Sequence, residues 1–278
     1  MFTSASQSSG GVPSFVRARG VVQARFERAG RTTRLIDSYE TGGLRLRTPK
    51  SDHGCEAVIL NTAGGMAGGD EWRMRFSAER KSRVWLTTQS AEKIYRTDAD
   101  DTIVSTELSL AESARVTWVP QETILFNGSK LKRSLTVRMA ESASAILLEM
   151  TVFGRFECGE QLQSGAFFDR WRIWRGNSLI FADDVRLAGN IAAITLKPAA
   201  GDGATAVATL CYVSQKAEKS LQSLRTVLDG ANADWGASAW NGMLVARFAG
   251  RDPFAVRCLV ARALRHLSKI DVPKVWSI

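Results

Sequence analysis

The stretch LNTAGGMAGGD, from Leu60 to Asp70, contains two glycine pairs and lies between two segments typical of β-strands. The run CEAVILN leads into it, and the run DEWRMRFSAE follows it. In the second run, Trp72, Met74 and Phe76 share one face and alternate with arginines on the other. Because this alternation has the two-residue period of a strand, it predicts a half-buried strand. We therefore expect the glycines to form the corner between two strands, where they can adopt positive φ.

A nucleotide site is the alternative interpretation of these glycines, and their spacing argues against it. They lie at positions i, i+1, i+4 and i+5, as Gly64, Gly65, Gly68 and Gly69. A dinucleotide-binding turn has glycines at i, i+2 and i+5 before a helix, and a phosphate loop ends in Lys followed by Ser or Thr. Here two acidic residues follow Gly69, and the next segment is a predicted strand.

Short β-type runs recur over most of the chain and predict a mainly β protein. The further runs are GVVQARFE, TTRLIDSYE, GGLRLRTP, RVWLTTQ, TIVSTELSL, ARVTWVP, LKRSLTVRMA, SAILLEMTVF, RWRIWRG and NSLIFADDVRL. Strands spaced by about 8–12 residues, with turn residues between them, are typical of all-β architectures.

Two stretches near the C-terminus have helical periodicity instead. Residues 214–230 place apolar residues at helical spacing, and residues 251–270 do so over a longer stretch. In the second stretch Asp252 is a predicted N-cap, and Pro253 suits the first helical position. The run at 242–250, GMLVARFAG, predicts a buried strand between the helices. We expect one domain from residue 16 to residue 278, ending in a helix–strand–helix segment, with 197–206 as a linker.

The composition limits the possible partners and the environment of the protein. The 278 residues carry a net charge of +9, which favours acidic partners. Residues 1–15 are polar and rich in Ser and Gly, so we expect a disordered N-terminal extension and no secretion signal. No apolar run reaches the roughly 18 residues of a membrane span. The four scattered cysteines, Cys55, Cys158, Cys211 and Cys258, predict reduced thiols in a cytosolic protein.

Catalytic motifs are missing from the sequence. His53 and Cys55 form an isolated His-x-Cys pair, and no neighbouring Cys or His completes a zinc site. Cys258 and His266 lie eight residues apart on a predicted helix, too far apart to hold one ion. Nothing in these patterns supports an enzyme.

Two glutamates lie on apolar strand faces. Glu122 shares its parity with Ile124, and Glu149 shares its parity with Leu147 and Phe153. Buried carboxylates are costly unless they are paired, hydrated or bound to a metal. Each glutamate either points to solvent or pairs with an arginine, or the two line a hydrated passage for a divalent cation.

The stretch RWRIWRGNSLIF alternates basic and aromatic residues. Aromatic residues among basic ones can bind single-stranded nucleic acid by stacking. The simpler interpretation, which we favour, is a strand with one apolar face and one solvated basic face.

Four stretches together resemble the UreD family of urease accessory proteins, called UreH in some bacteria. They are LNTAGGMAGGD, WLTTQSAEKIYRT, WVPQETILFNGS and LLEMTVFGRFECGE, and GMLVARFAG and VPKVWSI near the C-terminus also fit. The resemblance extends from about Val16 to the end of the chain. It implies a mainly β fold in which many strands form a helical stack, with two helices.

The same resemblance implies a function. Members of the family are cytoplasmic and non-enzymatic, and they bind apo-urease with UreF and the GTPase UreG. The assembly inserts nickel into urease, with UreE as the expected nickel donor, and a nickel tunnel has been proposed for the family. We expect no permanent cofactor, no nucleic acid and no membrane contact.

Under this resemblance two sets of residues are candidates for function. Glu122 and Glu149, with Asp70 at the exit of the glycine corner, are predicted to line a transient nickel path. A basic helix face is predicted to dock UreF, and its residues are Arg257, Arg262, Arg265 and Lys269. Two other functions stay open: a basic β-rich nucleic-acid-binding protein, and a hydrolase that uses Glu122 or Asp70.

Overall fold

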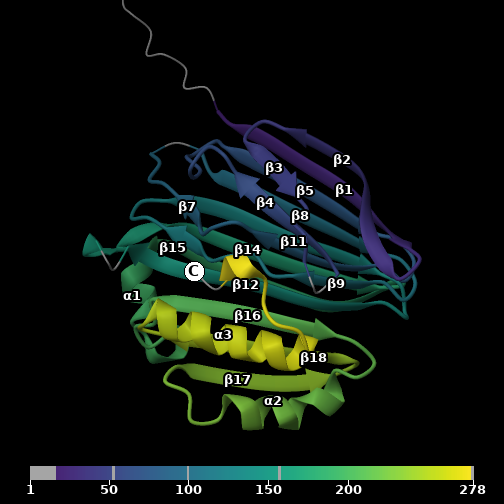
Figure 1. The fold of residues 1–278 in the computed structure, drawn as a ribbon. Coiled ribbons are helices and arrows are strands. Elements are labelled where there is room, and N and C mark those ends of the chain that lie inside the picture. Colours follow the sequence, from purple (N-terminus) through teal and green to yellow (C-terminus); the bar gives the residue numbers. More distant parts are fainter. Residues whose placement is uncertain (1–16, 52–53, 99, 156–157, 277–278) are drawn as a thin grey trace, which may run out of the picture.

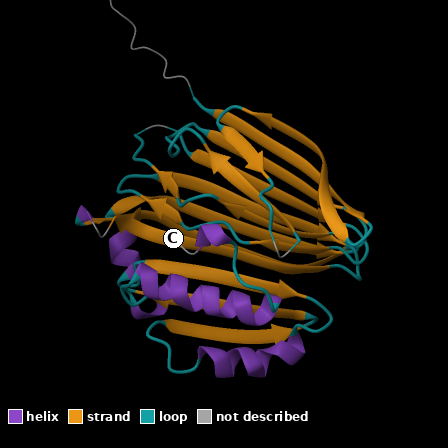
Figure 2. Cartoon of the chain, viewed as in Figure 1, coloured by secondary structure: helices purple, strands orange, loops and turns teal. Residues whose placement is uncertain are grey.

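A computed structural model describes residues 17–51, 54–98, 100–155 and 158–276. In these residues two β-sheets pack face to face, and the helices lie on one side of the pair (Figures 1 and 2). The expected N-terminal extension, residues 1–15, and His53 lie outside the described residues.

The first sheet has seven strands. In spatial order they are β15 (Ser178–Asn190), β14 (Ser164–Arg175), β11 (Lys130–Met139), β8 (Thr102–Leu110), β5 (Glu71–Ala78), β1 (Arg19–Ala29) and β2 (Thr32–Thr41).

The second sheet has eleven strands. The main path is β17 (Asp234–Trp240), β18 (Met243–Gly250), β16 (Ala206–Val213), β12 (Ser144–Arg155), β9 (Arg115–Trp118), β6 (Arg83–Thr88), β4 (Cys55–Asn61) and β3 (Leu44–Arg47). Three short strands branch from it: β7 (Glu92–Ile94), β10 (Thr123–Leu125) and β13 (Glu160–Gln161).

The chain winds between the two sheets as a solenoid. From β4 to β14 it passes from one sheet to the other and back, so that spatial neighbours within each sheet are parallel. This winding makes about four stacked coils. Antiparallel strands flank the coils at both ends, with β2 and β3 at one end and β15, β16, β17 and β18 at the other. The expected mainly β helical stack is therefore confirmed.

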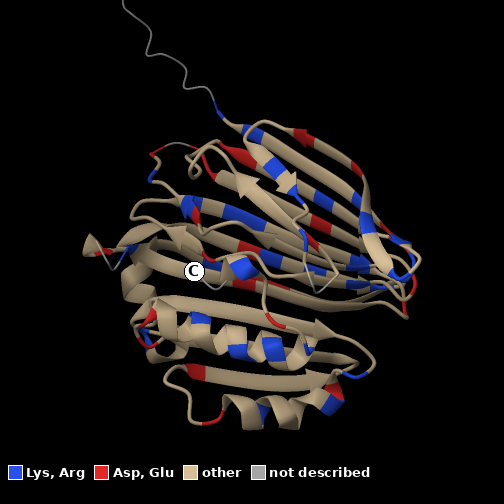
Figure 3. Cartoon of the chain, viewed as in Figure 1, with Lys and Arg blue, Asp and Glu red and all other residues tan. Residues whose placement is uncertain are grey.

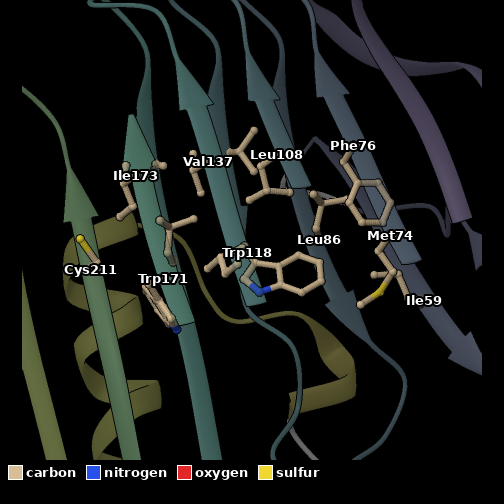
Figure 4. Packing of buried hydrophobic residues seen from close by; sticks show 14 of the residues in the cluster. Ile59, Met74, Phe76, Leu86, Leu108, Trp118, Val137, Trp171, Ile173 and Cys211 are labelled. Carbon is tan, nitrogen blue, oxygen red and sulfur yellow. The ribbon is translucent and has the colours of Figure 1, made fainter. Parts of the chain in front are cut away.

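Equivalent positions of successive coils stack in rows across the core. Phe76, Leu108, Val137 and Ile173 pair in register across four neighbouring strands and form one such row. Figure 4 shows this row together with Trp118, which reaches it from the opposite sheet. Because each coil buries its apolar face only against its neighbours and the other sheet, the rows hold the stack together.

Three α-helices complete the fold: α1 (Ile191–Thr195), α2 (Leu221–Leu228) and α3 (Pro253–Ser268). Helix α3 packs on β16 and β18, and α2 packs on α3, so a second core lies outside the larger sheet. The Asp252 side chain accepts a hydrogen bond from the Phe254 amide at 2.9 Å, as the sequence predicts for an N-cap.

The C-terminal part differs in detail from the sequence prediction. The helix expected over 214–230 is shorter, because α2 begins only at Leu221, after a short 3-10 turn. Two strands, β17 and β18, separate α2 from α3 where we expected one, and β16 was not predicted. The supposed linker at 197–206 contains a 3-10 turn and the first residue of β16.

The glycine run forms the corner between β4 and β5, as expected. Gly64, Gly65 and Gly69 all have positive φ, which L-residues rarely adopt. A side chain at Gly65 would overlap the ring of Tyr95, and one at Gly68 would overlap Thr97. The glycines therefore let the corner fold closely onto β7 and the segment that follows it.

Candidate functional site

An arginine occupies the apolar inner face of the smaller sheet. On β11, Arg133 lies between Leu131 and Leu135 on the buried side of the strand and is only 6% exposed. In its row it is flanked by Val104 of β8 and Asp169 of β14. A buried guanidinium is tolerated only when it is paired and fully hydrogen-bonded.

Every N–H group of the Arg133 guanidinium has an acceptor. Asp169 accepts two parallel bonds, from Nε at 3.0 Å and from Nη2 at 2.7 Å. Nη1 donates to Glu149 at 2.8 Å and to Thr123 at 3.2 Å, and Nη2 also donates to Thr151 at 3.1 Å. Because Asp169 belongs to one sheet and the other three acceptors to the opposite sheet, Arg133 joins the two sheets.

Glu149 is the carboxyl group that faces Arg133 across the interior. Its second oxygen accepts a hydrogen bond from Trp118 Nε1 at 2.9 Å, and the residue is 6% exposed. Burial raises the pKa of Glu149 and outweighs the opposing effect of Arg133, while nearby Asp169 raises it further. When both carboxyl groups are ionised, the cluster holds two negative charges against one positive charge.

A cavity of about 220 Å³ lies beside this cluster and opens to the surface near Gly64 and Ser90. Apolar side chains from both sheets form its walls, among them Ile59, Met74 and Leu131. Arg133 and Glu149 lie at one part of the lining, and the Gly64–Gly65 corner lies at another.

Glu92 on β7 also lines the cavity, near the glycine corner. Asn61 Nδ2 donates to its two carboxylate oxygens at 2.9 and 3.0 Å. Burial raises the pKa of Glu92 to about 7, and the bond from Asn61 only partly offsets this effect. The Trp72 side chain is also buried in the lining, near enough to Glu92 to lower its pKa slightly.

A second, more open groove of about 580 Å³ lies next to the cavity. Ser90, Ala91 and Gln121 line both spaces. In the groove, Arg257 of α3 donates to Glu122 at 2.5 Å and to Gln121 at 2.5 Å. The cavity and the groove are therefore neighbours, separated by a few shared side chains.

The three predicted nickel-path residues occupy different places. Glu149 lies in the interior beside the cavity, and Glu122 lies in the neighbouring groove. Asp70 holds the glycine corner, because its two oxygens accept from the amides of Ala18 and Ala67 at 2.8 Å each. The structure does not bring the three together, and Glu122 and Glu149 each pair with an arginine. Within the described ranges, no three His, Cys, Asp or Glu side chains are grouped so as to hold a metal ion.

The predicted basic face of α3 needs one correction. Arg257 is mostly buried and binds Glu122, Gln121 and the carbonyl of Trp276, so it does not belong to a free basic face. Arg262 and Lys269 are exposed, and Arg265 is exposed and pairs with Asp271 at 2.6 Å.

The histidine and the cysteines in the described residues have structural surroundings. His266 contacts the Ser223 hydroxyl at 2.9 Å, and burial lowers its pKa. All four cysteines are free thiols. Burial raises the pKa of Cys55 to about 11 and that of Cys211 to about 12, so both stay protonated near neutral pH.

Sequence reasoning missed three residues of the site: Arg133, Asp169 and Glu92. A signal existed for the first two, because Arg133 shares its strand face with Leu131 and Leu135, and Asp169 shares its face with Trp171. No comparable signal marked Glu92, because β7 is only three residues long.

Comparison with known proteins defines the class. The family model described as UreD urease accessory protein matches residues 18–277. A urease accessory protein UreD from Beijerinckia indica is 42% identical over 94% of this chain and 97% of its own length. One from Rhizobium leguminosarum is 41% identical over 98% of both chains, and UreD 1 of a Bradyrhizobium species is 39% identical over 94% of both.

These matches place the chain among the accessory proteins of urease. More specifically, it belongs to the UreD urease accessory protein family. No helix in the described part of the chain is both long and apolar enough to cross a membrane.

Arg133→Met should destabilise the fold strongly, because it leaves Glu149 and Asp169 buried without their cation. Breaking a buried ion pair in this way costs about 3–5 kcal/mol. We expect the loss, measured by urea denaturation, to be smaller at pH 5 than at pH 8, since protonation relieves the unpaired carboxylates. Arg138→Met, on the exposed face of the same strand, is the control and should change stability by less than about 1 kcal/mol. Equal losses in the two variants would contradict the assigned role of Arg133.

The raised pKa of Glu92 predicts a pH-dependent stability. With a folded-state pKa of about 7 against an ordinary value of 4.5, the folded chain binds the extra proton between these values. The contribution of Glu92 to the free energy of unfolding is therefore present at low pH and is lost as the pH rises through about 7. Relative to wild type, Glu92→Gln should become more stable between pH 5 and pH 8, by at most about 3 kcal/mol. Parallel pH profiles of wild type and variant would show that Glu92 titrates normally.

Proposed function

We propose that this chain assists the maturation of urease as a non-catalytic scaffold and that nickel passes through its interior on the way to apo-urease. Membership of the UreD family supports the role in maturation. The charged cluster beside the cavity is the observation that carries the proposal of a nickel path.

The chemistry of the cavity suits a cation in transit. Ni²⁺ binds carboxylate, imidazole and thiolate ligands, and a dense set of such ligands would retain it. The cavity instead carries two separate carboxyl groups, Glu92 near the glycine corner and Glu149 inside. Sparse carboxylates attract a cation without chelating it.

Arg133 limits the affinity of the inner carboxylate. One oxygen of Glu149 is occupied by Arg133 and the other by Trp118, so a passing cation must compete with both. The surplus negative charge of the cluster still favours a cation nearby. This combination gives attraction with ready release, which a conduit requires.

The adjoining groove offers a third carboxylate along such a route. Glu122 is paired with Arg257 there, and Gln121 borders both the groove and the cavity. We propose that nickel moves between the two spaces past Gln121. Asp70 has a structural part in this proposal, because its bonds to backbone amides hold the glycine corner in place.

The proposed partners follow from the family. We propose that the chain binds apo-urease together with UreF and the GTPase UreG in the cytoplasm and that UreE supplies the nickel. On α3, the exposed Arg262 and Arg265 are proposed to meet UreF, whereas Arg257 serves the internal structure.

Glu92→Gln tests the nickel path, because it keeps the shape and one of the two hydrogen bonds from Asn61 and removes the charge. In cells that express the urease genes with this variant, we expect normal assembly with UreF and apo-urease. The nickel content and the specific activity of the purified urease should fall severalfold. Glu112→Gln, at an exposed glutamate far from the cavity, is the matched control and should leave both at wild-type values. Fully loaded urease from the Glu92→Gln strain would refute the path through this cavity.

A double charge reversal, Arg262→Glu with Arg265→Glu, tests the docking of UreF. The two new glutamates would repel an acidic surface on UreF, so co-purification with UreF should weaken at least severalfold. Thermal unfolding should stay within a few degrees of wild type, because both side chains are exposed. Undiminished co-purification with a normal melting curve would place the UreF site elsewhere.

A further inference from the structure

We propose that the outer face of the smaller sheet is a docking surface for an acidic α-helix on a folded protein of the urease assembly. The helices α2 and α3 pack on the larger sheet, and α1 lies at the end of β14 and β15 with Ile191 in the inner core, so among the described residues no helix covers the outer face of the smaller sheet (Figure 1).

The face has the shape of a trough between two lines of arginine. Arg73 and Arg75 stand on β5, and Arg170 and Arg172 stand on β14. On the two strands between them, β8 and β11, the residues at the same levels of the register are Ser105 and Ser134 at one level and Glu107 and Thr136 at the next. Three strand spacings separate the arginine lines by about 14 Å. An α-helix is about 10–12 Å wide with its side chains, so it fits this interval.

The face is strongly cationic. At the outward positions of β5, β8, β11 and β14 arginine and lysine outnumber the carboxylates, which are Glu71 and Glu107. On the neighbouring strand β15, Asp184 also pairs with Arg170 and Arg172. Figure 3 shows the cationic positions along the strands of this sheet. A partner with carboxylates on both flanks of a helix would complement the two arginine lines.

Local bonds hold several of these arginines in place. Arg73 Nε donates to Glu71 at 2.6 Å, and Arg75 Nε donates to Glu107 at 3.2 Å. Arg172 Nη2 donates to Asp184 at 2.6 Å. Each guanidinium has five donors, so these bonds fix its direction and leave further N–H groups for a partner.

Other contacts on this face disfavour nucleic acid as the occupant. Single strands bind through aromatic rings that stack on bases, but the two aromatic residues on this face of β14 are already covered. Arg186 lies over the ring of Phe168 at 5.1 Å, and Arg138 lies over the ring of Trp174 at 5.4 Å. Glu107 in the trough would repel a phosphate backbone, whereas a protein partner can meet it with a basic residue.

The size of the face matches a stable interface. Seven strands span about 29 Å, and the eight-residue overlap of β1 with β5 spans about 26 Å along the strands. The whole face measures about 750 Å², close to the roughly 800 Å² that each partner buries in a standard complex. A helix in the trough covers about half of this face, and the rest of the folded partner would lie over the flanking strands.

The test measures binding of the full-length chain to purified apo-urease, UreF and UreG, each separately, by calorimetry at low and high salt. The choice of probes rests on the proposed function. Arg73→Glu with Arg170→Glu should weaken one of these complexes on the order of tenfold, and salt should weaken the wild-type complex. Lys216→Glu with Lys219→Glu makes the same change of charge at exposed residues beside α2, and it should bind like wild type.

The outcomes separate this inference from the proposed function. If the chain binds its partners and the Arg73/Arg170 variant binds all of them equally well, the docking surface is wrong and the proposed function stands. If wild type binds none of the three proteins, both are wrong. Tighter binding of a short single-stranded DNA than of any of the proteins, lost in the same variant, would also overturn the inference.

Discussion

The hydrogen bonds of one buried guanidinium, that of Arg133, connect the two sheets in the interior of this protein. A stack of coils gains its stability from rows of apolar side chains, and a charge in such a row is costly. Arg133 offsets that cost by using all five of its N–H groups, on Asp169 in its own sheet and on Glu149, Thr123 and Thr151 in the other. The two sheets are thereby joined by directed bonds as well as by apolar packing, and the partners on each strand must keep their register.

This cluster explains why the interior is not uniformly apolar. Its polar groups border a cavity instead of a close-packed row, and burial raises the pKa of Glu149. At another part of the lining, the glycine corner folds onto β7 and places Asn61 against Glu92. The glycine run therefore shapes a cavity wall without cradling a phosphate. Together these features place two buried carboxyl groups, Glu92 and Glu149, along one cavity of a basic protein.

The local pattern of the sequence predicted much of the fold. Strict alternation identified β5 within one residue at each end, and helical spacing with the Asp252–Pro253 cap identified α3. The same reasoning missed β7, since a three-residue strand carries no measurable period. It also missed β17, in which small and exposed residues hide the alternation.

The site was less predictable than the fold, because register across strands decides it. Strand parity placed Glu149 on an inward face, but only the winding brings it opposite Arg133 and next to Asp169. Arg133 and Asp169 could have been singled out as charged residues on apolar faces, whereas nothing in the sequence pairs Asn61 with Glu92. For Arg257 the error is the opposite one. We expected this arginine on a solvent-exposed helix face, but it is mostly buried and pairs with Glu122.

A cavity-filling variant tests the central claim, that nickel passes through this interior, most directly. Thr106 is buried on β8 and lines the cavity, and Thr106→Phe would fill part of the space without changing Glu92, Arg133 or Glu149. The measurement is the nickel content of urease matured in cells that carry this variant, with the melting temperature of the variant and its co-purification with apo-urease as controls. The account predicts a stable, assembled complex that delivers little nickel. Urease with its full nickel content, matured by a variant whose cavity is shown to be filled, would contradict it.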